Sequence, residues 1–169
     1  MDKIEDISTI EEFFTRDQEY REKYGPKTIT LFQVGTFFEV YGYKNDNETE
    51  MQGSLIDEFC EICDMEKGKK HGYYKNKSLY MAGFKTTPWQ LQKYKNRLVD
   101  HNYTVVVIVQ LEEMQENTSG IKKRKRIVEG VYSPGTHVPV ETDSQLNNNM
   151  VCIWIEPYKV NGYTNHAIG

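Results

Sequence analysis

Residues 28–41, Thr28-Ile29-Thr30-Leu31-Phe32-Gln33-Val34-Gly35-Thr36-Phe37-Phe38-Glu39-Val40-Tyr41, form two extended segments joined through a glycine. The first segment, Thr28–Val34, is rich in β-branched and apolar residues, which favours a β-strand. Gly35-Thr36 breaks or bends the chain, and an extended pattern resumes over Phe37–Tyr43. The sequence therefore predicts two consecutive extended segments of a sheet.

Helices are predicted around these segments, which places the domain in the α/β class. Ser8-Thr9-Ile10-Glu11 has the form of a capping box and predicts a helix over residues 9–24. A helical stripe runs over Leu55–Cys63, and Thr87-Pro88 signals the start of a third helix. Further strands are expected over residues 79–84, 103–111 and 126–132, and loops over the lysine- and glycine-rich residues 67–77 and the polar residues 112–120.

The chain is expected to hold more than one structural unit. Residues 1–140 form the predicted α/β domain, in which the run Val105–Val109 has the character of a buried central strand. Residues 141–149 are polar, end in asparagines and are predicted to be a linker. Residues 150–169 read as the beginning of a second domain, with a hairpin signalled by Pro157 and Gly162.

Composition narrows the class of protein. Apolar residues make up 38% and charged residues 27% of the 169 residues, as in an ordinary globular protein. The longest apolar runs are too short to cross a bilayer, and the first residues lack the features of a secretory signal. Three cysteines argue against a disulfide scaffold and for a reducing compartment. We therefore expect an intracellular protein, in a compartment that the sequence does not specify.

The charge is segregated along the chain although its net value is only −4. Nine basic residues and no acidic residue lie between Lys67 and Arg97, and a second basic cluster is Lys122–Arg126. Such segregation can create a basic face, which attracts phosphates through its local field. The alternative is that these lysine-rich segments only keep the protein soluble.

Phe37 and Glu39 are the candidate binding residues. Alternate side chains of a strand share a face, so Phe37, Glu39 and Tyr41 should lie on one side and Phe38 and Val40 on the other. If the second pair faces the core, an aromatic ring and a carboxylate are displayed together on the outer face. That arrangement suits stacking on a flat ligand with a hydrogen bond to its edge. The alternative is that Phe37 belongs to the core and Glu39 is an ordinary acid at a strand end.

The pair Cys60 and Cys63, with His71 nearby in sequence, raises the question of a zinc site. Structural zinc needs four ligands at suitable spacing, and the third cysteine is far away at Cys152. Cys60 and Cys63 also share the helical stripe with Phe59. Buried helix positions are the favoured interpretation, and no metal site is predicted.

Several short motifs occur in a fixed order along residues 9–137. They are Gly35-x-Phe37-x-Glu39-x-Tyr41, Met81-Ala82-Gly83, Leu98-Val99, the valine-rich Tyr103–Gln110, the basic Arg124–Val128, and Ser133-Pro134-Gly135-Thr136. This ordered set resembles the mismatch-recognition domain (domain I) that opens DNA mismatch repair proteins of the MutS family. Thr36 stands where the family commonly has Asp, which indicates a divergent branch.

The resemblance implies a mixed β-sheet flanked by helices and a DNA-binding function. It implies that Phe37 enters the minor groove as a wedge on a mispaired or unpaired base, and that Glu39 hydrogen-bonds to that base. The implied partner is double-stranded DNA with mismatches or small loops. Candidate phosphate contacts are the lysines of the first basic segment, namely Lys69, Lys70, Lys75, Lys77 and Lys85.

The resemblance also sets expectations beyond this chain. Residues 150–169 would begin the family's connector domain, and the full-length protein would be a dimer and a DNA-dependent ATPase that uses ATP and Mg. This chain has no phosphate-binding loop of the Gly-x-x-x-x-Gly-Lys-Ser/Thr type, so it is expected to be non-enzymatic, without cofactor.

Trp89 and Tyr94, like most aromatics of the first basic segment, are expected to pack in the core.

Three alternatives remain open at the level of sequence. A small metal-dependent nuclease could use Glu39, Asp57 and Glu66 with Lys69, although their spacing matches no known motif. A protein-interaction domain could use the basic face to bind an acidic partner. A MutS-family domain could also keep the fold and bind DNA junctions or protein partners instead of mismatches.

Overall fold

The computed structural model describes residues 2–116, 122–136, 153–160 and 163–168. The chain divides into two compact units, Met1–His137 and Val138–Gly169. Each unit is described by itself below.

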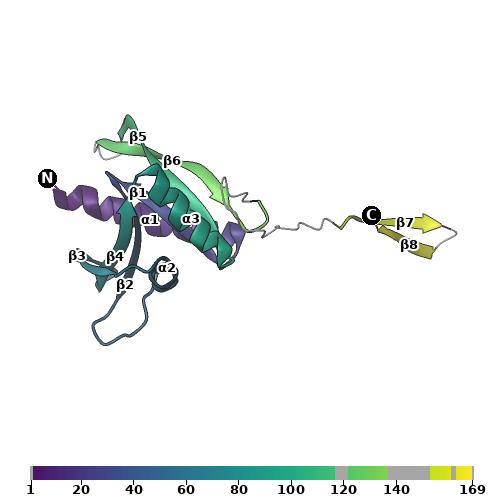
Figure 1. Ribbon diagram of the computed structural model, residues 1–169, viewed down its shortest axis with the longest axis horizontal. Coiled ribbons are helices and arrows are strands. Elements are labelled where there is room, and N and C mark those ends of the chain that lie inside the picture. The colour runs from purple at the N-terminus through teal and green to yellow at the C-terminus, as the bar shows by residue number, and fades with distance from the viewer. Residues whose placement is uncertain (1, 117–121, 137–152, 161–162, 169) are drawn as a thin grey trace. The chain divides into compact units, whose positions relative to one another are not determined.

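Six strands of the first unit form one sheet in the order β3-β4-β2-β1-β5-β6 (Figure 1). β1 pairs with β5 in parallel, and all other neighbouring strands are antiparallel. The sequence-based prediction of an α/β domain with a mixed sheet is therefore confirmed. The strands are β1 (Thr28–Val34), β2 (Phe37–Lys44), β3 (Gly68–Tyr74), β4 (Lys77–Lys85), β5 (Thr104–Glu116) and β6 (Lys122–Tyr132).

Helices cover both faces of the sheet: α1 (Asp2–Tyr24) lies on one face, and α2 (Ile56–Cys63) and α3 (Pro88–Asp100) lie on the other (Figure 1). On the α1 face, the ring of Phe13 packs edge-on against Phe32 and Tyr41, with centroids 5.7 and 5.1 Å apart. On the opposite face, Phe84 of β4 contacts Tyr94 of α3. Because both faces are buried, β5 carries the continuous apolar run predicted for a central strand, and residues 105–108 are fully buried.

The prediction of an exposed loop over residues 67–77 is wrong. These residues form β3 and the tight turn into β4, and Lys75 and Asn76 adopt left-handed backbone conformations in that turn (φ 50° and 61°). β3 is an edge strand that hydrogen-bonds to β4 through its backbone. Such a strand needs few apolar side chains, so the lysine- and glycine-rich sequence of β3 lacks the pattern from which a strand is predicted.

Two other element boundaries differ from the prediction. β5 extends to Glu116, and its residues 114–116 pair with β6 from Lys122, so the predicted polar loop over residues 112–120 begins as strand; residues 117–121 lie outside the described residues. α1 begins at Asp2, so Ser8 lies within the helix and is not its cap. The helix at Pro88 begins as predicted, but the Thr87 hydroxyl contacts the Gln90 side chain instead of a backbone N–H.

In the second unit, β7 (Ile155–Val160) and β8 (Tyr163–Ile168) form an antiparallel hairpin, as predicted from the sequence. β7 begins a few residues later than the predicted strand start at Met150, and the predicted linker 141–149 falls outside the described residues. Among the helices described in the two units, none has the length and apolar character needed to cross a membrane.

Candidate nucleic-acid interface

Phe37 lies at the tip of the hairpin between β1 and β2. Gly35 has a left-handed conformation (φ 58°), which a glycine adopts without a steric penalty, and the two-residue turn Gly35-Thr36 brings Val34 opposite Phe37. Phe37 is thus the first residue of β2, and 39% of its surface is exposed. The prediction that this ring is displayed agrees with its position in the structure.

Hydrogen bonds anchor the turn that carries Phe37 on both sides. The Gly35 N–H donates to Oε1 of Gln110 (2.8 Å), and the Gln110 N–H donates to Oε1 of Gln33 (2.8 Å). The Gln33 amide in turn donates to the Gly35 carbonyl (3.0 Å). From the other side, the Thr86 N–H donates to the Thr36 carbonyl (3.0 Å). The exposed ring therefore stands on a fixed backbone, which limits the entropy lost when a ligand contacts it.

The two faces of β2 agree with the alternation predicted from the sequence, but only one end of the Phe37 face is open. Phe38 and Val40 are buried on the α2 and α3 face. Tyr41, on the same face as Phe37, is fully buried under α1. The expectation that Glu39 and Tyr41 lie on an outer face is therefore wrong, because α1 covers that face everywhere except at the end of the strand.

Glu39 lies just inside this covered region and is only 7% exposed. The Tyr41 hydroxyl donates a hydrogen bond to Oε2 of Glu39, and Nζ of Lys70 lies 3.6 Å from the same oxygen. A buried carboxylate without such partners would be strongly destabilising. Glu39 is thus held between a hydroxyl and a cation, two residues from the exposed ring of Phe37.

Gly83 of β4 lies directly opposite Glu39. A Cβ atom at this position would collide with the carbonyl oxygen of Phe38. The glycine of the Met81-Ala82-Gly83 motif therefore permits β4 to pair closely with the part of β2 that carries the candidate residues.

The five candidate phosphate-binding lysines lie at different distances from Phe37. Lys85 is exposed and is the direct register partner of Phe37 on β4. Lys70 pairs with Glu39, as described above. Lys75 and Lys77 lie at the turn, at the opposite end of the β3–β4 hairpin, and Lys69 pairs with Tyr80 near the middle of β4.

That opposite end is well separated from the exposed ring. Lys44, seven residues after Phe37 on β2, pairs with Ser78 beside the turn, which corresponds to about 23 Å at roughly 3.3 Å per residue. Lys77 is also occupied by protein partners, since its Nζ lies 3.1 Å from Glu48 and 2.8 Å from Gln52. Lys75 is exposed at this end, and Lys69 is exposed on β3 with its Nζ 3.5 Å from Oδ1 of Asp46.

The second basic cluster, Lys122–Arg126, does not act as one surface. Arg126 is buried, and its guanidinium donates to Glu12 (3.0 Å) and to the carbonyl of Gln33 (3.1 Å) while it lies over the ring of Phe32. The expectation that the second cluster contributes to a basic face is therefore wrong at Arg126, because this side chain ties β6 to α1 and β1. Arg124 and its neighbour Lys125 remain accessible, and Lys125 is paired with Glu113.

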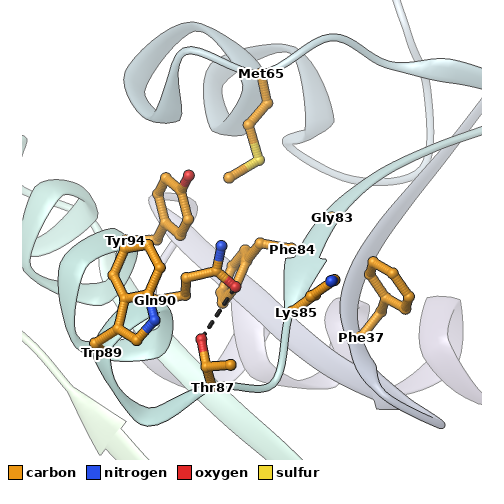
Figure 2. A pocket seen from close by; sticks show the side chains of 9 residues that line it. All are labelled: Phe37, Met65, Gly83, Phe84, Lys85, Thr87, Trp89, Gln90 and Tyr94. Carbon is orange, nitrogen blue, oxygen red and sulfur yellow. Dashed lines mark hydrogen bonds between the residues drawn. The ribbon is translucent and has the colours of Figure 1, made fainter.

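A hollow of about 470 Å³ adjoins Phe37 at the ends of β2 and β4 (Figure 2). Trp89, in the first turn of α3, is 63% exposed at this hollow, so the prediction that it packs in the core is wrong. Tyr73 on β3 is also exposed, whereas Tyr94 is partly buried against Phe84. Helical spacing alone did not distinguish the exposed Trp89 from the partly buried Tyr94 on α3. The lining residues are Phe37, Met65, Gly83, Phe84, Lys85, Thr87, Trp89, Gln90 and Tyr94.

The remaining candidate groups behave as structural residues. Cys60 and Cys63 are free thiols buried on α2, as the sequence predicted, and burial raises the pKa of Cys63 to about 12. Asp57 pairs with Lys67 and accepts from the Met51 N–H, so both oxygens of its carboxylate are engaged by residues outside the set proposed for a nuclease. Within the described residues, no three His, Cys, Asp or Glu side chains are grouped to hold a metal ion.

A displayed aromatic ring beside a lysine, on a sheet whose free edge is basic, has the character of a nucleic-acid-binding module. Comparison with known protein families identifies the kind of module. The model of the MutS domain I family matches residues 18–141. The chain therefore belongs to the MutS domain I family, the DNA mismatch-recognition module of mismatch repair proteins, which binds DNA and is not catalytic.

One similar protein is a putative DNA mismatch repair protein, the MutS homolog L359 of Acanthamoeba polyphaga mimivirus. It is 29% identical over 152 residues, which cover 87% of this chain and 12% of that protein. The chain thus spans about an eighth of the length of this relative.

Proposed function

We propose that the domain recognises mismatched DNA by inserting the ring of Phe37 at a mispaired or unpaired base, while Glu39 hydrogen-bonds to that base. The observation that carries the proposal is the position of Phe37, exposed at the tip of a hairpin whose backbone is anchored on both sides. An apolar wedge unstacks a base step at a cost of a few kcal/mol, which contacts to the bent duplex offset.

Selectivity follows from the state of the DNA. A mismatched step is already poorly stacked and easily deformed, so the wedge costs less there than in a paired duplex. The minor groove offers few base-specific groups, which is why deformability must carry most of the discrimination.

The carboxylate of Glu39 is held in a fixed position from which it can hydrogen-bond to a base. It is close to the strand end, and Tyr41 and Lys70 determine where its oxygens lie. Lys70 also offsets the repulsion between this carboxylate and the DNA phosphates. A base that displaces the lysine from Glu39 would leave the ammonium group available to a neighbouring phosphate.

Among the proposed phosphate contacts, Lys85 has the position best suited to a backbone next to the inserted ring. Lys69 and Lys75 would contact the duplex farther away, and Lys77 would first have to leave Glu48 and Gln52. Such contacts position the protein on the duplex and carry no sequence information.

The full-length protein is proposed to be an intracellular, DNA-associated dimer with ATPase activity that depends on ATP and Mg, and residues 150–169 to begin its connector domain. These expectations rest on membership of the family and on the small share of the mimivirus relative that the chain covers.

Photocrosslinking tests the contact itself. We expect p-benzoylphenylalanine at position 37 to crosslink to nucleotides at the mismatch of a heteroduplex. The same group at Tyr73, which is 73% exposed on β3, serves as a matched control that should not select the mismatch. Crosslinks from position 37 that are spread evenly along the duplex would contradict the proposal.

A further inference from the structure

The hollow beside Phe37 is lined by side chains, among them Trp89 and Gln90, that have no role when the ring of Phe37 alone is inserted into DNA. Phe37 borders it, whereas Glu39, which is only 7% exposed, is not among the residues that line it. Figure 2 shows Phe37 and Trp89 on opposite sides of the hollow, so a base that stacks on Phe37 leaves the Trp89 side unused. The hollow's volume of about 470 Å³ is in the range of sites that bind small organic molecules.

Three side chains around this hollow offer three different interactions. The indole of Trp89 presents a flat apolar surface, 63% exposed, that packs against no other aromatic ring among those described. Lys85 supplies a positive charge and is the single charged side chain among the nine lining residues. Exposed aromatic surface next to a cation fits a ligand with a flat ring and a negative group.

Gln90 supplies the third interaction. The Thr87 hydroxyl contacts Oε1 of Gln90 at 3.1 Å, so the amide oxygen is occupied. Figure 2 shows the amide nitrogen of Gln90 on the side of the group away from Thr87, among the side chains that line the hollow. The nitrogen is thereby available as a donor to a carbonyl oxygen or ring nitrogen of a ligand.

We propose that this hollow binds a second unpaired nucleotide, the neighbour of the one that stacks on Phe37. Its base would stack on Trp89, an acceptor on the edge of the base would meet the Gln90 amide, and its phosphate would pair with Lys85. This inference rests on the proposed function of Phe37 and adds to it a second nucleotide site, which is filled only when the DNA carries two or more unpaired nucleotides.

The energetics favour such a site for loops and not for single mispairs. A nucleotide that is already unpaired costs little to move out of the stack, whereas a paired neighbour would have to break its base pair first. Stacking on an aromatic side chain strengthens binding of each base by about fivefold to about a hundredfold. The hollow therefore raises affinity for larger loops selectively.

Fluorescence of Trp89 tests this proposal directly. The chain has two tryptophans, so Trp154→Phe, in the second unit, leaves Trp89 as the single reporter. We expect a duplex with a two-adenine loop to change the Trp89 emission, whereas a loop whose second nucleotide is abasic binds without that change. Equal responses to the two loops, or no response to either, would overturn the proposal.

Affinities provide the second readout. Trp89→Ala should lower affinity for the two-nucleotide loop, relative to a one-nucleotide loop, by about fivefold to about a hundredfold, and Trp89→Phe should restore most of it. An unchanged ratio in Trp89→Ala refutes the second site. If instead Phe37→Ala leaves the one-nucleotide preference intact, the proposed wedge itself fails, so the two failures are distinguishable.

Discussion

Replacing Asp17 by Asn tests how the buried polar groups beneath α1 respond to pH. Asp17 is 1% exposed, and its Oδ2 lies 2.9 Å from Nε of Arg21 in a pair that lacks hydrogen-bond alignment. Burial raises the pKa of this carboxyl from 3.8 to about 6, against the opposing effect of Arg21. The group is therefore more easily protonated in the folded protein than in the unfolded chain.

The sign of the effect on stability follows from this difference. Below pH 3.8 the carboxyl is protonated in both states, and its contribution to folding is at its maximum. As the pH rises to about 6, the unfolded chain releases its proton first, so the free energy of unfolding falls. A shift of roughly two pKa units corresponds to a loss of about 3 kcal/mol, at about 1.4 kcal/mol per unit.

Urea denaturation at several pH values between 4 and 7, followed by circular dichroism, measures this loss. The difference in unfolding free energy between the wild type and Asp17→Asn should decrease by about 2 kcal/mol across that range, because Asn does not titrate and part of the loss has already occurred by pH 4. Glu19→Gln, an exposed carboxylate on the same helix, is the matched control. Parallel pH profiles for the wild type and Asp17→Asn would show that Asp17 does not titrate with a raised pKa in the folded protein.

Three further outcomes follow from individual contacts. Gln110→Ala removes the acceptor of the Gly35 N–H, so we expect unfolding to be easier by about 1 kcal/mol and heteroduplex preference to weaken, measured by denaturation and by DNA titration; unchanged DNA preference would show that the anchor is unimportant. Lys85→Met should reduce the slope of log affinity against log salt by about 1, whereas Lys77→Met should change it less because Lys77 is held by protein carboxylate and amide groups; equal reductions would argue against the assignment. Cys63, 1% exposed with a pKa raised to about 12 by burial, should resist thiol reagents in the folded protein and react only after unfolding, and rapid native labelling would contradict its burial.

Much of the fold was predictable because its core elements carry strong local signals. The β-branched run before Gly35, the buried strand at residues 105–108 and the helix start at Pro88 all appear where the sequence placed them. β3 was missed because an edge strand is held by backbone hydrogen bonds, which leave little trace in side-chain pattern.

The candidate site was predictable in part. Strand alternation was sufficient to separate Phe37 from Phe38, and the exposed position of Phe37 at the strand end agrees with it. Strand alternation places Tyr41 beside Glu39, but the second partner, Lys70, was not predictable, because it reaches Glu39 across the sheet from β3. The burial of Arg126 likewise depends on Glu12, which is 114 residues away in sequence.

Binding of heteroduplex and homoduplex DNA at one fixed salt concentration, by the wild type and by Phe37→Ala, is the most decisive measurement. If Phe37 is the mismatch probe, the wild type prefers the heteroduplex and Phe37→Ala binds both duplexes with nearly equal affinity, since phosphate contacts are retained. A Phe37→Ala variant that keeps the full preference for the heteroduplex would contradict the role of this ring.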